Sequence, residues 1–136
     1  MEVVLGFVKV CLCGTFCLSG ICKITPKWGA DVYAAMDEAF QNRFVPFWHK
    51  AFFLSELGLE VPAAAMKFLF GGLEVLCAVL LLTKYKFSAA ILLFGLMSLV
   101  LMTHLFLGEF AELPTPLVLC LASLGVGFVG FKPLRQ

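Results

Sequence analysis

The sequence predicts an all-α membrane protein, a polytopic four-helix bundle with an interfacial helical segment between its first and second spans. The chain has 136 residues, of which 62% are hydrophobic and 14% are charged, and its mean hydropathy is +1.02. A soluble domain of this size is much less apolar. Four apolar stretches each approach the roughly 20 residues that cross a bilayer as a helix. We therefore expect a single transmembrane domain over residues 1–136.

The first predicted span covers residues 3–23. It ends near Lys23 because Pro26 follows, and proline lacks the amide that an interior helical turn needs. A cleaved signal peptide is the alternative interpretation, but such a peptide opens on basic residues, whereas Glu2 precedes the apolar run here and Lys9 lies inside it. We expect the segment to stay in the protein as a membrane helix.

Residues 27–60 form the predicted interfacial connection. Over residues 30–43 the pattern is helical, with an apolar side and a polar side. The apolar side comprises Val32, Met36 and Phe40, and the polar side Asp31, Asp37, Glu38 and Gln41. Residues 44–59 mix aromatic rings with charged side chains, which is typical of the headgroup level of a membrane. We expect this connection to rest on the bilayer or to dip into it.

The other three spans are predicted at residues 62–83, 87–107 and 113–131. Short turns join them, and short turns make neighbouring helices antiparallel. The formal net charge of the chain is only +1, so no electrostatic argument favours nucleic acid as a partner. The lipid bilayer and other membrane proteins are the expected partners.

Glu74 interrupts the apolar run of the second span, and this position is the main candidate functional site. An acid near the centre of a membrane helix costs about 2.5 to 3.5 kcal/mol, so it usually faces other helices, pairs or titrates. Gly71 and Ala78 share its helix face. We expect this face to meet a stripe of small and polar residues on the first span, because small side chains let helices approach closely in lipid. That stripe comprises Lys9, Cys13, Cys17, Gly20 and Lys23.

Three arrangements of Glu74 remain open. Lys9 lies about 9 Å along its helix from Val3, and Glu74 lies about 14 Å along its own helix from Thr83, so a lysine side chain can bridge the difference. Alternatively, Lys9 extends to the membrane surface and a protonated Glu74 finds a hydroxyl or carbonyl partner. In the third arrangement Glu74 contacts a partner protein or a ligand.

Other polar residues predict no metal, cofactor or catalytic site. His104 falls near the end of the third span, where we expect an interfacial hydrogen bond, although Glu109 and Glu112 are near enough in sequence to complete a site. The six cysteines contain no C-x-x-C motif and are expected to behave as small apolar residues. In the fourth span a track of small residues indicates packing inside the bundle or, alternatively, a homodimer seam. That track comprises Ser123, Gly127 and Gly130.

Several segments resemble the transmembrane protein 35 family, whose NACHO-like members are chaperones of nicotinic acetylcholine receptors. The resemblance is carried by Gly20-Ile21-Cys22-Lys23-Ile24-Thr25-Pro26-Lys27 with Asp31, Tyr33, Met36 and Phe40, by Gly72-Leu73-Glu74-Val75, and by His104 with Gly108-Glu109. More distantly, Lys9 and the Gly20-x-x-Lys23 pattern are similar to DoxX-like four-helix membrane proteins.

The resemblance implies a chaperone of the endoplasmic reticulum membrane that promotes folding and assembly of ion-channel subunits. It implies no enzyme activity and no cofactor. The alternative function is a DoxX-type redox subunit that binds a quinone among its helices. In that case Glu74, His104 and the cysteines would take part in proton and electron transfer.

Overall fold

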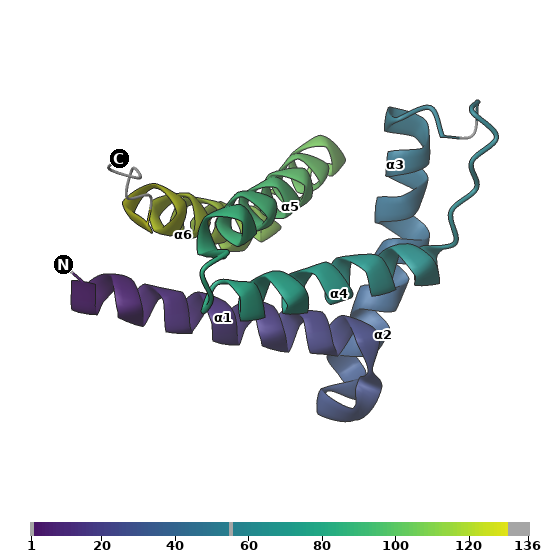
Figure 1. The fold of residues 1–136 in the computed structure, drawn as a ribbon. Helices are drawn as coiled ribbons and strands as arrows, with labels where there is room; N and C mark the ends of the chain where they lie inside the picture. The colour runs from purple at the N-terminus through teal and green to yellow at the C-terminus, as the bar shows by residue number, and fades with distance from the viewer. Residues whose placement is uncertain (1, 55, 131–136) are drawn as a thin grey trace. The chain divides into compact units, whose positions relative to one another are not determined.

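The computed structural model describes residues 2–54 and 56–130, and its elements follow the order drawn in Figure 1. Every regular element in this part of the chain is helical, which confirms the all-α class. Four helical segments among the described residues are long and apolar enough to cross a membrane. By the length and composition of its helices, the chain is a multi-pass membrane protein.

The four long helices lie close to the ranges that the sequence predicts. They are α1 (Glu2–Ile24), α4 (Ala63–Leu80), α5 (Lys86–Leu107) and α6 (Pro114–Gly130). The largest difference is at the end of α4, which the sequence extends to Thr83. The Thr83 hydroxyl donates to the Leu80 carbonyl at 2.8 Å and accepts from the Tyr85 amide at 3.2 Å, and these bonds favour a turn over further helix. Phe131, the last residue of the fourth predicted span, lies outside the described residues.

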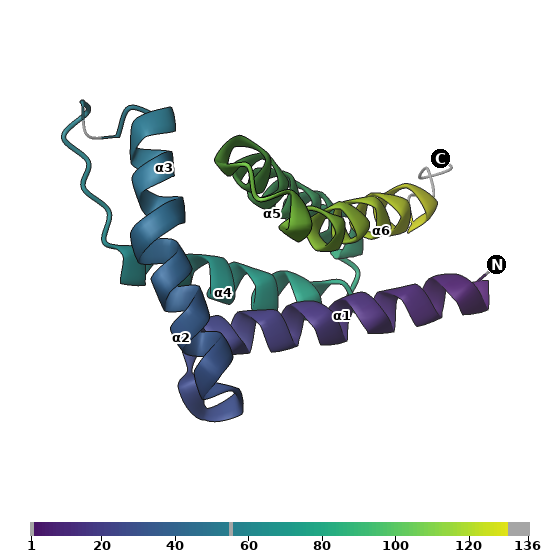
Figure 2. The ribbon, with the colours of Figure 1, turned by 180° about the vertical axis from the view of Figure 1, so that it is seen from behind.

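A helical segment connects α1 to α4, as predicted, and it is longer than the sequence indicates. A short 3₁₀ turn, η1 (Pro26–Trp28), leads into α2 (Ala30–Ala39), a π-helical turn η2 (Phe40–Phe44) and α3 (Val45–Ala51). Figure 2 shows α2, η2 and α3 as one continuous rod. The Val45 amide donates to the Phe40 carbonyl five residues back, and Pro46 follows without an amide. The π-helical turn accommodates the proline, which has no amide to donate, and the helical rod continues through it.

The chain divides into two compact units. Unit 1 takes in the described residues of 1–17 and 74–136, and unit 2 takes in those of 18–73. The boundary falls inside α1 and α4 and not in a linker, and the expectation of a single transmembrane domain stays a prediction.

Unit 1 has one apolar core to which all four long helices contribute. Its fully buried members include Phe16 from α1, Ala78 from α4, Leu93 from α5 and Val126 from α6. Helices α5 and α6 lie side by side, as both Figure 1 and Figure 2 show. A buried apolar side chain contributes about 1.5 to 3 kcal/mol when its reference is water, but in lipid the packing itself has to supply the attraction.

The seam between α5 and α6 uses part of the predicted small-residue track. Ser123 is fully buried, and a Cβ atom built at Gly127 would lie 3.4 Å from the Ala90 Cβ atom. Across the same seam, Ser98 and Cys120 are hydrogen-bonded, with 3.4 Å between oxygen and sulfur. Ser123 and Gly127 therefore pack inside the chain and are not available as the seam of a homodimer. The homodimer itself stays a prediction.

Unit 2 holds a close contact between two long helices, at Gly20 of α1 and Gly71 of α4. A Cβ atom built at Gly71 would lie 2.8 Å from the Gly20 carbonyl oxygen and 3.0 Å from the Lys23 Cβ atom. Only a residue without a side chain permits such an approach, because 2.8 Å is shorter than a carbon–oxygen contact allows. The predicted meeting of the two small-residue faces is confirmed at these glycines.

The adjacent glycines of α4 provide a matched test of this contact. Gly71→Ala is expected to destabilise the protein by about 1 to 3 kcal/mol, because its methyl group overpacks against the α1 backbone. Gly72→Ala is expected to stabilise it by about 0.5 to 1 kcal/mol, since alanine favours the helix and a Cβ atom there meets nothing within 4 Å. Unfolding of each variant in detergent, followed by circular dichroism, measures the difference. Equal effects at the two positions would contradict the packing.

Candidate functional site

A buried ion pair in unit 2 joins α4 to the connecting rod. Lys67 is the fifth residue of α4, and its side chain is only 1% exposed. Its ammonium lies 2.8 Å from Asp37 Oδ1 on α2 and 3.7 Å from the centroid of the Tyr33 ring. The second carboxylate oxygen of Asp37 accepts from the Gln41 amide at 3.1 Å. The lysine charge is therefore compensated by a carboxylate and an aromatic face together.

The sequence of α2 places these partners of Lys67 on one face. Tyr33, Asp37 and Gln41 follow each other at four-residue steps, and such residues are neighbours on a helix surface. Asp37, on the predicted polar side, is only half-exposed and pairs with Lys67. Val32, on the predicted apolar side, is exposed. The electrostatic requirement of Lys67 outweighs the hydrophobic pattern of this short helix.

Aromatic rings reinforce the same attachment. The rings of Trp48 and Phe70 stack with centroids 5.1 Å apart, and Phe40 meets Phe70 edge to face at 5.8 Å. Phe70 lies one turn after Lys67 on α4, so the ion pair and the ring cluster share one side of that helix. The sequence assigns the aromatic residues after position 43 to the headgroup level. Trp48 and Phe44 are buried within the protein, while Phe52 and Phe53 are exposed. Their depth in the membrane stays a prediction.

The predicted face of α4 around Glu74 is turned inward. Glu74 is 1% exposed and Ala78 is fully buried, and Gly71 packs on Gly20. Lys23, also a predicted site residue, is buried and donates to Ser19 Oγ at 2.7 Å. These residues therefore belong to the interior of the protein and do not offer themselves directly to a partner's helix.

Lys9 and His104 are the remaining predicted site residues. Lys9 is half-buried on α1. Its pairing with Glu74, one of the three arrangements that the sequence leaves open, stays a prediction. His104 is buried at the end of α5, and its Nδ1 is hydrogen-bonded to Glu109 Oε2 at 2.6 Å.

The end of α5 explains how His104 reaches Glu109. Gly108 adopts a left-handed conformation with φ of 75° and closes the helix, as glycine commonly does. The next amide, that of Glu109, donates to the His104 carbonyl at 2.9 Å, which folds the glutamate side chain back toward the histidine ring. The structure thus shows a hydrogen bond of His104 at the helix end, while its position at the membrane surface stays a prediction.

Within the described residues, no group of three or more histidine, cysteine, aspartate or glutamate side chains is placed to hold a metal ion. All six cysteines are free thiols. Cys77 and Cys120 are buried in the apolar core of unit 1, as expected for cysteines that act as small apolar residues.

The sequence did not single out Lys67, because this lysine lies near the start of the second predicted span. The available signal was the combination of a lysine inside an apolar helix with an aspartate one helical turn after a tyrosine in the preceding segment. Chemically, the site neutralises and shields an ammonium group. Its clearest physical effect is to hold α2 against α4.

Comparison with known proteins identifies a matching protein family. The sequence profile described as the DoxX-like family matches residues 7–126. No curated protein sequence matches the chain significantly. The matched range includes all of unit 2 and most of each long helix.

A double-mutant cycle measures the Asp37 and Lys67 interaction. Asp37→Asn is expected to cost about 2 kcal/mol, because it leaves a buried ammonium without a counter-charge. Lys67→Met is expected to cost about 1 kcal/mol, since the remaining carboxylate is 39% exposed and keeps water contacts. The double variant is expected to match Lys67→Met closely.

Thermal unfolding in detergent is the measurement for this cycle. Glu38→Gln is the matched control, because Glu38 is the exposed neighbour of Asp37 on the same helix. We expect that change to leave stability within about 0.5 kcal/mol. Strictly additive effects of the two single changes would show that the ion pair contributes nothing.

Proposed function

The chain belongs to the DoxX-like family, and from that premise we propose that it is a membrane-embedded chaperone for the folding and assembly of ion-channel subunits. Nicotinic acetylcholine receptor subunits are the first clients to test, because the sequence resembles the transmembrane protein 35 family over several segments. The endoplasmic reticulum membrane, where channel subunits assemble, is part of the same proposal.

One structural observation supports a role in binding other helices: the outer face of α1. We define this face as the exposed residues Gly6, Phe7, Val10, Cys11, Gly14 and Thr15. Cβ atoms built at Gly6 and Gly14 meet no atom within 4 Å. The surface at these two glycines is therefore open to close approach by another helix backbone, which is how helices associate in lipid.

The polar groups of this face are suited to a lipid setting. The Thr15 hydroxyl donates to the Cys11 carbonyl at 2.8 Å. Its hydrogen is therefore bonded within the helix and needs no partner from the lipid. The face is consequently stable while empty, yet it can exchange lipid for a client helix at small cost. A temporary binding surface needs both properties.

Unassembled channel subunits present matching surfaces. Their helices carry small and polar residues that later become subunit contacts, and these are poorly solvated by lipid tails. The outer face of α1 would cover such a helix until its final neighbour arrives. Because Glu74 is buried, we propose that the outer face of α1, and not Glu74, binds the client helix.

Two substitutions on the outer face of α1 test the proposal. The chain is coexpressed with a nicotinic receptor subunit, and binding of a receptor ligand at the cell surface is measured. Gly6→Leu with Gly14→Leu is expected to lower the increase in surface binding about tenfold, the effect of losing about 1.4 kcal/mol of association. Leucine fills the open surface while preserving the helix.

The matched control is Gly95→Leu with Gly125→Leu, at exposed glycines of α5 and α6 that also have nothing within 4 Å of a Cβ atom. We expect the control to keep full activity at equal expression. If the unaltered chain changes surface binding of no channel subunit, the proposed function is wrong. Quinone-dependent redox activity of the purified protein would instead favour the alternative function.

A further inference from the structure

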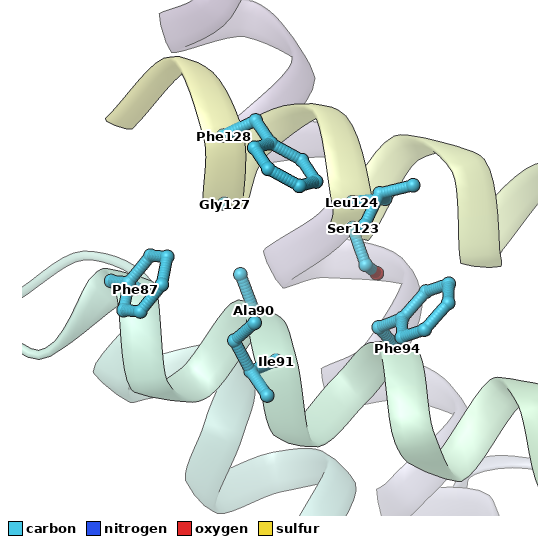
Figure 3. A pocket seen from close by; sticks show the side chains of 8 residues that line it. All are labelled: Phe87, Ala90, Ile91, Phe94, Ser123, Leu124, Gly127 and Phe128. Carbon is cyan, nitrogen blue, oxygen red and sulfur yellow. The ribbon is translucent and has the colours of Figure 1, made fainter. Parts of the chain in front are cut away.

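A small apolar cavity lies in unit 1 between α5 and α6, and Figure 3 shows the side chains that line it. Its volume is about 50 Å³. The floor consists of the buried residues Ala90, Ser123 and Gly127, while Phe87, Ile91 and Phe128 of the rim are exposed. The cavity therefore opens toward the outside of the two helices. The remaining rim residues are Phe94 and Leu124.

The only polar side chain of this lining is Ser123. Its side chain is fully buried, and its hydroxyl oxygen has no hydrogen-bond partner in the part of the chain that the structure describes. In Figure 3 the hydroxyl points from α6 toward the α5 side of the cavity. An unpaired hydroxyl in an apolar interior is unfavourable, so a ligand that pairs with it is favoured.

The lining excludes several kinds of occupant. A buried water molecule needs two to four polar partners, whereas the lining side chains provide one. A plain hydrocarbon chain would leave the hydroxyl unpaired. A client helix is disfavoured because close helix approach in lipid needs small residues at the surface, and here exposed phenylalanine rings form the rim.

We propose that this cavity binds the hydroxyl end of a linear aliphatic alcohol from the membrane, with the alcohol hydrogen-bonded to Ser123 Oγ. A serine hydroxyl both donates and accepts, as an alcohol does. The volume is about a third of the roughly 150 Å³ that holds benzene in an engineered protein cavity. It therefore admits the hydroxyl and the first few carbons, and the rest of the chain lies along the aromatic rim.

The position along α6 explains why an alcohol would prefer the cavity to the surrounding lipid. Ser123 lies about 14 Å along α6 from Pro114, near the middle of the helix, by the rise of about 1.5 Å per residue. Lipid tails at this depth offer no hydrogen-bond partner. Two hydroxyl groups that are each unpaired in the hydrocarbon satisfy one another in the cavity.

Photolabelling of the purified full chain in lipid nanodiscs tests the inference. The probe is 1-octanol carrying a diazirine at its third carbon, and the matched probe is the same diazirine on octane. We expect the alcohol probe to label peptides containing residues 87–94 and 123–128, and excess 1-octanol to compete. Ser123→Ala is expected to lower this labelling about fivefold, as for one lost hydrogen bond. Ser88→Ala, at an exposed serine of α5, is the control that should leave it unchanged.

Four results would overturn the proposal. One is equal labelling by the octane probe, and another is labelling that Ser123→Ala does not reduce. The third is a lower melting temperature for Ser123→Ala, since that would mean that the hydroxyl already has a partner inside the protein. Cross-linking of this cavity to a coexpressed channel subunit, without competition by octanol, would assign it to a helix and would also overturn the alcohol site. None of these outcomes depends on the chaperone function.

Discussion

Lys67 places a positive charge on a helix that is otherwise apolar enough to cross a membrane, and unit 2 is organised around the partners of that charge. Its ammonium is enclosed by Asp37 and Tyr33 of α2. Because lipid offers no counter-charge, the connecting segment has to fold back onto α4. The stacked rings of Trp48 and Phe70 then extend the contact along the same side of α4.

Most of the residues that the sequence predicts as partner-binding are buried inside the protein. Glu74, Ala78 and Lys23 are buried, and Gly71 meets the α1 backbone. The outer face of α1 remains exposed, and it is interrupted by Gly6 and Gly14, which have open space beside them. The proposed chaperone role therefore rests on shape at the outer face of α1, while the cavity beside Ser123 provides a separate site with one polar atom.

Hydropathy and short-range pattern were sufficient for the helical class and for the approximate bounds of the four long helices. A run of about 20 apolar residues has few stable conformations other than a helix in a membrane. The small-residue faces of the first and second spans were also predictable, since glycine in a membrane helix usually marks a close approach. The end of α4 was less predictable, because the Thr83 hydroxyl competes locally for backbone bonds.

The sequence by itself determined where helices form and which of them are apolar enough for a bilayer, because both follow from residues near in sequence. Only the tertiary structure decided that Asp37 pairs with Lys67. The same is true of the burial of Glu74 and of the Ser123 hydroxyl, which has no hydrogen-bond partner among the described residues. A charge or hydroxyl can be satisfied by any suitable group that the fold brings near, and that choice depends on packing between distant segments.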